Sequence, residues 1–208
     1  MSDTLRLLRQ RFGVGPRRGR IMLPRVGRKD LPILVRDLGM TRGAEIGVWR
    51  GAYSAMFCEA CPQIHMLCVD PWQSYQAWLD TKNAMEPAKA AAFIEESYQI
   101  AKARLAPLNA TIIRKFSADA AKDVPDGSLD FVYVDGNHVL DAVLEDLTLW
   151  TPKVRSGGLI AGHDYRVFTN KPTIHVVEAV HRFTAQHKID PWFVLARDLT
   201  PSFMWVKP

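Results

Sequence analysis

Short apolar runs separated by helical segments make up most of this chain. A run of four to eight apolar residues bounded by turn residues is typical of a strand that is buried on both faces. This pattern predicts seven strands, at residues 43–49, 64–70, 111–115, 129–135, 158–162, 192–196 and 202–206. Helices are predicted before and between them, at residues 30–38, 51–61, 88–105, 117–122, 139–150 and 173–187.

Strands that alternate with helices indicate βαβ units and a largely parallel sheet. The last two predicted strands are joined by residues 197–201 alone, which is too short for a crossover connection. We therefore predict an α/β fold with a mostly parallel seven-stranded sheet and an antiparallel C-terminal hairpin at one end. A chain of 208 residues suits one such domain.

Positive charge is concentrated near the N-terminus. Residues 1–42 hold eleven Lys and Arg against three Asp and Glu, a net charge of +8, so the remainder of the chain carries −3. We divide the chain into a basic N-terminal arm with short helices, residues 1–39, and a main domain, residues 40–208. Residues 5–12 are expected to form an amphipathic helix that packs on the domain or on a second copy in a homo-oligomer, followed by a solvated loop at residues 17–20. The alternative is contact with anionic lipid, nucleic acid or an acidic partner.

The three cysteines are an odd number, which fits a reducing compartment and a cytoplasmic protein. Cys58 and Cys61 form a C-x-x-C pair, but no second Cys or His pair follows at a spacing that would bind zinc. We therefore expect buried, inert thiols. No stretch reaches the ~18 apolar residues that span a bilayer, and the N-terminus lacks the pattern of a secretory signal.

Two predicted strands end in an acid with a histidine nearby. Asp135 ends the fourth predicted strand and is followed by Gly-Asn-His138, while His163 and Asp164 follow the fifth. In open α/β sheets, ligands bind at the carboxyl ends of the strands. We therefore expect these four side chains to meet in one site.

A glycine loop follows the first predicted strand. Gly47 and Gly51 stand between Glu45 and Ser54, where glycine permits a close approach of the backbone to a ligand. The helix N-terminus beyond them favours a negative group such as a carboxylate. Asp70, at the end of the next strand, can accept hydrogen bonds from two ribose hydroxyls. Dinucleotide enzymes use G-x-G-x-x-G, and position 49 is not glycine here, so we expect a nucleoside-type ligand other than NAD.

The combination of E-x-G-x-x-x-G-x-x-S, V-D, D-G-x-H and G-G-x-x-x-G-H-D resembles the class I S-adenosylmethionine-dependent methyltransferases over residues 40–206. The likeness extends to the small bacterial metal-dependent group that includes macrocin- and rhamnosyl-type sugar O-methyltransferases, with catechol O-methyltransferase more distant. The resemblance implies a Rossmann-like, doubly wound fold. It also implies a set of cofactor-binding residues: Glu45, Gly47 and Gly51 at the methionine end, with Ser54 and Asp135, then Asp70 at the ribose, Trp72 beside the cofactor or the acceptor, and Ser117 and Ala118 beside the adenine.

The second group of strand ends suggests a metal ion and a base. Asp135 and Asp164 offer the hard oxygen ligands that suit Mg²⁺, and the resemblance implies that His163 joins them in holding a divalent ion. Relatives carry a carboxylate where this chain has His163, which opens the site to Mn²⁺ or another transition ion. The alternative is that one Asp caps a helix and His163 bonds to a loop. By the resemblance, His138 stands where such enzymes often place the general base that removes a hydroxyl proton.

The expected activity is an S-adenosylmethionine-dependent O-methyltransferase that acts on a hydroxyl of a small molecule, such as a sugar or glycosylated metabolite. Aromatic residues at 71–87 are expected to cover the acceptor, with Tyr165, Arg166 and Lys171 as the opposite wall. A non-haem iron oxygenase that uses the two histidines and a carboxylate is one alternative. A non-catalytic cofactor-binding or scaffolding protein is another. A nucleic-acid substrate is disfavoured because the main domain is acidic.

Overall fold

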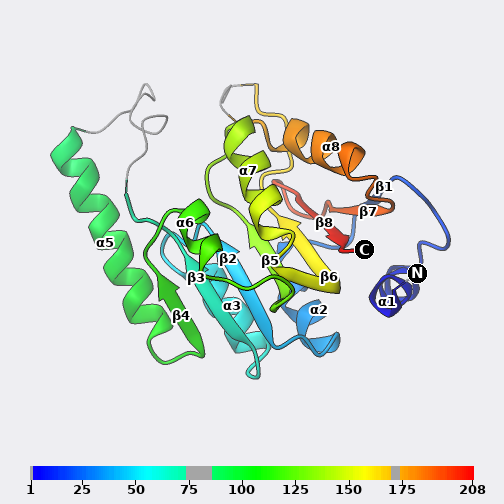
Figure 1. The fold of residues 1–208 in the computed structure, drawn as a ribbon, viewed down its shortest axis with the longest axis horizontal. Coiled ribbons are helices and arrows are strands. Elements are labelled where there is room, and N and C mark those ends of the chain that lie inside the picture. The colour runs from blue at the N-terminus through cyan, green and yellow to red at the C-terminus, as the bar shows by residue number, and fades with distance from the viewer. Residues whose placement is uncertain (1, 74–85, 170–173) are drawn as a thin grey trace.

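Eight strands form one sheet in the computed structural model of the chain, which describes residues 2–73, 86–169 and 174–208 (Figure 1). Their order across the sheet is β1-β7-β8-β6-β5-β2-β3-β4. β8 is antiparallel to both of its neighbours, and every other neighbouring pair is parallel. The strands are β1 (Arg20–Leu23), β2 (Arg42–Ile46), β3 (His65–Val69), β4 (Ala110–Ile113), β5 (Leu129–Val134), β6 (Val154–Gly162), β7 (Trp192–Leu195) and β8 (Ser202–Val206).

Helices cover both faces of the sheet (Figure 1). On one face, a hydrophobic core joins the sheet to α1 (Asp3–Phe12), α2 (Leu31–Asp37), α3 (Ala52–Ala60) and α5 (Pro87–Leu105). On the other face, a second core joins it to α6 (Ser117–Lys122), α7 (Leu140–Trp150) and α8 (Val176–Gln186). A short 3-10 helix, η1 (Arg28–Asp30), precedes α2.

The central strand β5 shows why the strands read as continuous apolar runs. Phe131 and Tyr133 pack into the core beneath α3, whereas Val132 and Val134 pack into the core beneath α7. Side chains alternate between the two faces of a strand. Because helices cover both faces, successive positions from Phe131 to Val134 all carry apolar side chains.

The predicted α/β class, the mostly parallel sheet and the β7–β8 hairpin are confirmed. The predicted number of strands is one too low, because residues 20–23 of the basic arm form β1. This strand pairs in parallel with β7, from Arg20 beside Trp192 to Leu23 beside Leu195. The hairpin therefore does not lie at the end of the sheet, and the predicted solvated loop at residues 17–20 leads directly into a strand.

The first helix of the arm packs on the body of the domain, where Leu8 is fully buried. Cys58, Cys61 and Cys68 are free and buried, as predicted for inert thiols. Burial raises the pKa of the Cys58 thiol to about 11. Within the described ranges, no helix combines the length and the apolar character needed to cross a membrane.

Candidate functional site

Four neighbouring strands end side by side at one edge of the sheet. Ile46 of β2 pairs with Val69 of β3 and with Val134 of β5, and Val134 in turn pairs with Gly162 of β6. The residue that follows each of these positions therefore lies at the same carboxyl edge. These residues are Gly47, Asp70, Asp135 and His163, all of which the sequence identified as site candidates.

Gly47 permits the ends of β2 and β5 to pass very close to each other. Its φ angle is 90°, and a Cβ atom at this position would lie 2.2 Å from the carbonyl oxygen of Asp135. Gly51 has a φ angle of 73° and forms the N-cap of α3. Both glycines therefore have a backbone reason to be glycine. At Gly47 the close approach is to Asp135 of the neighbouring strand, in addition to any ligand.

Glu45 lies beneath the glycine loop as a buried carboxyl group. Its side chain is 2% exposed, and the Ser54 hydroxyl donates a hydrogen bond to it. Burial raises the pKa of Glu45 to about 8. Ser54 is itself fully buried, and its hydroxyl oxygen also accepts a hydrogen bond from the Cys68 thiol at 3.2 Å. The structure therefore places Ser54 behind Glu45, where it supports that residue.

Asp70 organises the loops on either side of it. Its carboxylate accepts hydrogen bonds from the backbone N–H of Trp49 at 2.9 Å and of Trp72 at 2.7 Å. Burial raises its pKa, although these backbone donors oppose the shift. The indole of Trp72 is buried, packs against Tyr98 and donates to the Trp49 carbonyl at 2.8 Å. Trp72 thus fixes the loop after β2 from the interior of the protein. In that loop the exposed ring is that of Trp49, whose exposed fraction is 44%.

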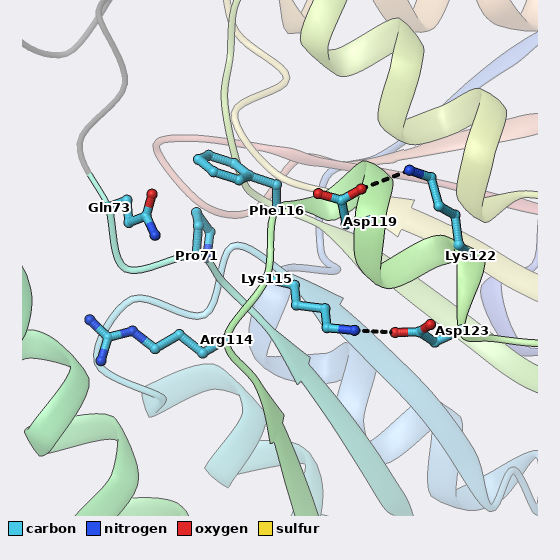
Figure 2. A pocket seen from close by; sticks show the side chains of 8 residues that line it. All are labelled: Pro71, Gln73, Arg114, Lys115, Phe116, Asp119, Lys122 and Asp123. Atoms are coloured by element: carbon cyan, nitrogen blue, oxygen red, sulfur yellow. Dashed lines mark hydrogen bonds and ion pairs between the residues drawn. The ribbon is translucent and has the colours of Figure 1, made fainter.

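A cavity of about 430 Å³ opens beside Pro71, the residue that follows Asp70, and lies between the ends of β3 and β4 and the helix α6 (Figure 2). The aromatic ring of Phe116 is 46% exposed at its rim. Two ion pairs, Lys115–Asp123 at 2.6 Å and Lys122–Asp119 at 2.7 Å, form its charged wall. The remaining lining residues are Pro71, Gln73 and Arg114.

Ser117 and Ala118 follow Phe116 directly, but the Ser117 hydroxyl is committed elsewhere. It donates to the buried carboxyl group of Asp146, and it accepts a hydrogen bond from the Trp150 indole at 2.8 Å. This network ties the start of α6 to α7. Ala118 is half-buried at the same helix start. The Ser117 hydroxyl therefore has no proton left to donate to a ligand at this edge.

Asp135, His138, His163 and Asp164 come together, as the sequence predicted. The Nε2 atom of His138 lies 2.9 Å from Oδ2 of Asp164 and 3.6 Å from Oδ1 of Asp135. The Nδ1 atom of His163 lies 3.7 Å from Oδ1 of Asp135 and 3.6 Å from Oδ1 of Asp164. Among the described residues, Asp135, His138 and Asp164 offer ligand atoms that all lie within 4.8 Å of one another.

The charges of this cluster depend on one another. Burial alone lowers the pKa of His138, but Asp135 and Asp164 outweigh it and raise that pKa to about 9. Conversely, His138 and His163 hold the pKa of Asp164 well below its usual range, against the effect of burial. Without another cation, His138 therefore carries a proton near neutral pH.

The comparisons with known proteins bear directly on this edge of the sheet. Residues 44–165 match the model of a family described as a methyltransferase domain, and this match covers more than half of the chain. The chain belongs to this methyltransferase family. The match runs from β2 to Tyr165 and so includes all four strand ends described above. Its domain has the Rossmann-like α/β fold that solved O-methyltransferases share.

Relatives of known structure share the fold of this methyltransferase at low identity. A protein described as a candidate caffeoyl-CoA O-methyltransferase from Staphylococcus aureus is 16% identical, with a TM-score of 0.62 over 99% of this chain and 93% of that one. An O-methyltransferase from Bacillus cereus, solved in complex with SAH, is 15% identical, with a TM-score of 0.58 over 100% and 92% of the two chains. The O-methyltransferase NovP is 19% identical, with a TM-score of 0.61 over 86% and 79%.

A curated relative, "Uncharacterized protein y4gI" of Sinorhizobium fredii (strain NBRC 101917 / NGR234), is 27% identical over 140 residues. The match covers 64% of this methyltransferase but only 14% of the relative's length. The chain thus corresponds to a small part of that protein.

The structure adds residues to the site that the sequence did not single out. Arg28 of η1 lies 2.8 Å from Asp135, and Asp146 anchors Ser117. Neither residue stands in a sequence pattern that indicates a binding site, because Arg28 belongs to a run of basic residues and Asp146 to an amphipathic helix. Tyr165 is 7% exposed and contacts His181 at 2.7 Å, so it packs inward and forms little of an acceptor wall. The aromatic residues Tyr75 and Trp78, and Lys171, lie outside the described residues.

The buried carboxyl group of Asp146 should make the stability of the fold depend on pH. Burial raises its pKa from 3.8 to about 6, so the folded state binds this proton more tightly than the unfolded state does. Its stabilising contribution is complete below the unfolded pKa and is lost as the pH rises through about 6. Relative to Asp146→Asn, the wild-type free energy of unfolding should therefore fall by about 2 kcal/mol between pH 4 and pH 7. Urea denaturation of both proteins measures this difference, and a pH-independent difference would contradict it.

Proposed function

We propose that this methyltransferase transfers a methyl group from S-adenosylmethionine to a hydroxyl group of a small molecule, and that a sugar or glycosylated metabolite is the class of acceptor. The observation that carries the proposal is the cluster of Asp135, His138, His163 and Asp164 in the same row as Asp70. A histidine beside paired carboxylates suits the removal of a hydroxyl proton. The family match and the fold shared with O-methyltransferases support it.

The cofactor is proposed to lie along the row of strand ends. Its methionine end would lie over Gly47 and Gly51, above the buried Glu45. Asp70 retains lone pairs beyond its two backbone hydrogen bonds, and these can accept from the ribose hydroxyls. The adenine ring is proposed to enter the cavity beside Pro71, where Phe116 offers an exposed aromatic face. When bound, S-adenosylmethionine supplies an activated methyl group.

The group formed by Asp135, His138, His163 and Asp164, here called the acidic cluster, fits a divalent metal ion. It combines two carboxylates with two imidazoles, a donor set that suits Mn²⁺ as well as Mg²⁺. The Nε2 atom of His138 is buried and, among the described residues, has no hydrogen bond of good geometry, although Asp164 lies 2.9 Å away. We propose that Asp135, His163 and Asp164 hold the ion. When bound, it would lower the pKa of the acceptor hydroxyl and orient it.

His138 is proposed as the general base. It lies on the loop after β5, and its backbone carbonyl accepts a hydrogen bond from His175 at 2.9 Å, which fixes that loop. A positioned base accelerates such a transfer by about 10²–10⁴-fold. Because the two carboxylates raise the pKa of His138 to about 9, the ring is protonated near neutral pH. A cation bound to those carboxylates would lower this pKa and leave the ring neutral, in the form that can accept a proton.

The compact grouping of Asp135, His138 and Asp164 favours a second assignment, in which His138 rather than His163 is the nitrogen ligand. The two assignments differ in what each histidine does to metal affinity. Separate alanine variants of the two histidines distinguish them, as argued in the Discussion.

The proposed reaction is tested by incubating the full chain with S-adenosylmethionine, Mn²⁺ or Mg²⁺, and a panel of sugars, glycosides and catechols. We expect O-methylated products by mass spectrometry, formed together with S-adenosylhomocysteine. Methyl groups found only on nitrogen or carbon would contradict hydroxyl transfer. Oxygen-dependent products formed without S-adenosylmethionine would favour the iron oxygenase alternative, and cofactor binding without transfer to any acceptor would favour a non-catalytic role.

A further inference from the structure

The N-terminal arm delivers an arginine to the metal-binding edge of the site. Because β1 runs parallel to β7, the chain leaves β1 at the same carboxyl edge of the sheet where the other strands end. It turns at Val26, whose N–H donates to the Leu23 carbonyl at 3.2 Å, and continues into η1. The sheet topology therefore places Arg28 near the strand ends of β2 and β5.

Several contacts fix η1 in this position. The backbone N–H of Arg28 donates to the Asp198 carboxylate, and its carbonyl accepts a hydrogen bond from the Tyr53 hydroxyl at 2.9 Å. Arg197 forms an ion pair with Asp30 at 2.9 Å. Both sides of the 3-10 helix are thus tied to the main domain, one through α3 and the other through the β7–β8 connection. Arg28 is held by its backbone as well as by its side chain.

The guanidinium group of Arg28 lies between two acids and two tyrosine rings. Its Nη2 atom is 2.8 Å from Oδ2 of Asp135 and 3.9 Å from Oε1 of Glu45. Its Cζ atom lies 4.0 Å from the centre of the Tyr53 ring and 5.2 Å from that of Tyr133. The side chain is only 26% exposed, so solvent screens its charge weakly. An arginine in such a site remains charged.

The two carboxylate oxygens of Asp135 therefore face different partners. Its Oδ2 atom faces Arg28, whereas its Oδ1 atom faces His138 at 3.6 Å and His163 at 3.7 Å. An ion in the acidic cluster would find a single free oxygen on Asp135. Only the Asp135 carboxylate would separate this ion from the positive charge of Arg28.

We propose that Arg28 is an internal cation of the site: it holds Asp135 with Oδ1 toward the histidines and lowers the affinity of the acidic cluster for divalent ions. This inference rests on the proposed function, because that function supplies the reason for an ion in the cluster. Repulsion between Arg28 and a divalent ion acts across a few ångströms in a poorly solvated site. Arg28 also favours ion binding slightly, because it holds the Asp135 carboxylate in one orientation. We expect this gain to be smaller than the repulsion, since fixing an aspartate side chain saves little conformational entropy.

The test is a calorimetric titration of the full chain with MnCl₂ alone. Arg28→Met and Arg28→Gln remove the charge at similar side-chain length, and both are expected to bind Mn²⁺ at least about tenfold more tightly than wild type. Arg28→Lys keeps the charge and should remain closer to wild type. Arg25→Met is the matched control, because Arg25 lies three residues earlier and is exposed, and it should leave the affinity unchanged. Adding Asp135→Asn to Arg28→Met should abolish the gain.

Equal or weaker Mn²⁺ binding by folded Arg28→Met and Arg28→Gln would overturn the inference, as would no Mn²⁺ binding by any of the proteins. Thermal unfolding confirms that each variant is folded. Binding of S-adenosylhomocysteine, measured on the same samples, reports separately on the proposed function. If the Arg28 variants bind Mn²⁺ no more tightly than wild type but still bind S-adenosylhomocysteine, the role of Arg28 is rejected and the proposed methyl transfer is not.

Discussion

Replacing His138 by alanine is expected to lower turnover by about 10²–10⁴-fold, the usual contribution of a positioned base. Affinity for S-adenosylhomocysteine should remain close to that of wild type, because His138 faces Asp135 and Asp164 and does not line the cavity in which we propose that the adenine binds. Single-turnover methyl transfer and calorimetry measure the two quantities on the same protein. Turnover that is unchanged would remove His138 from the proposed base role.

His163→Ala separates the base from the metal ligand. If His163 holds the ion, this variant loses Mn²⁺ affinity while His138→Ala retains it. The reverse result would assign the ligand role to His138, as its compact grouping with the two aspartates favours. His187→Ala serves as a control, because His187 is exposed at the end of α8 and packs on Phe183.

Replacing Asp70 by alanine is expected to weaken the binding of S-adenosylhomocysteine by about 100-fold or more. Hydrogen bonds to a charged group contribute about 1.5–3 kcal/mol each, and a ribose offers two hydroxyls to this carboxylate. The variant also frees the backbone N–H groups of Trp49 and Trp72, which loosens the loop that borders the site. Calorimetry gives the affinity, and thermal unfolding reports the effect on the loop.

Asp126→Ala is the matched control for Asp70→Ala. Asp126 is 71% exposed and pairs with Lys153 on a turn at the opposite end of β5. We expect wild-type affinity for S-adenosylhomocysteine in this variant. Equal affinities in Asp70→Ala and Asp126→Ala would show that Asp70 does not hold the ribose.

The sequence predicted the central strands because helices cover both faces of the sheet. A strand such as β5 is then apolar on both faces, as the run from Phe131 to Val134 is, and such a run is easily recognised. β1 has no such signal. Its four residues alternate between exposed and buried, and its identity as a strand depends on pairing with β7, far along the chain. Short edge strands are set by tertiary contacts more than by their own residues.

The site residues were predictable where they stand at strand ends, since the carboxyl ends of parallel strands share one edge. Asp70, Asp135, His163 and Asp164 are of this kind. Arg28 is not, because a charged residue in a basic arm is usually exposed and only the path of β1 brings it to Asp135. The interior position of Trp72 was equally hidden, since it depends on packing against Tyr98 of a distant helix.

A crystal structure of the full chain with S-adenosylhomocysteine and Mn²⁺ tests the proposed cofactor and metal site most directly. We expect the homocysteine end to lie over Gly47, the ribose hydroxyls to donate to Asp70, and the ion to lie between Asp135 and Asp164. S-adenosylhomocysteine bound elsewhere, or an ordered complex in which Asp70 makes no contact with the ribose, would contradict this proposal.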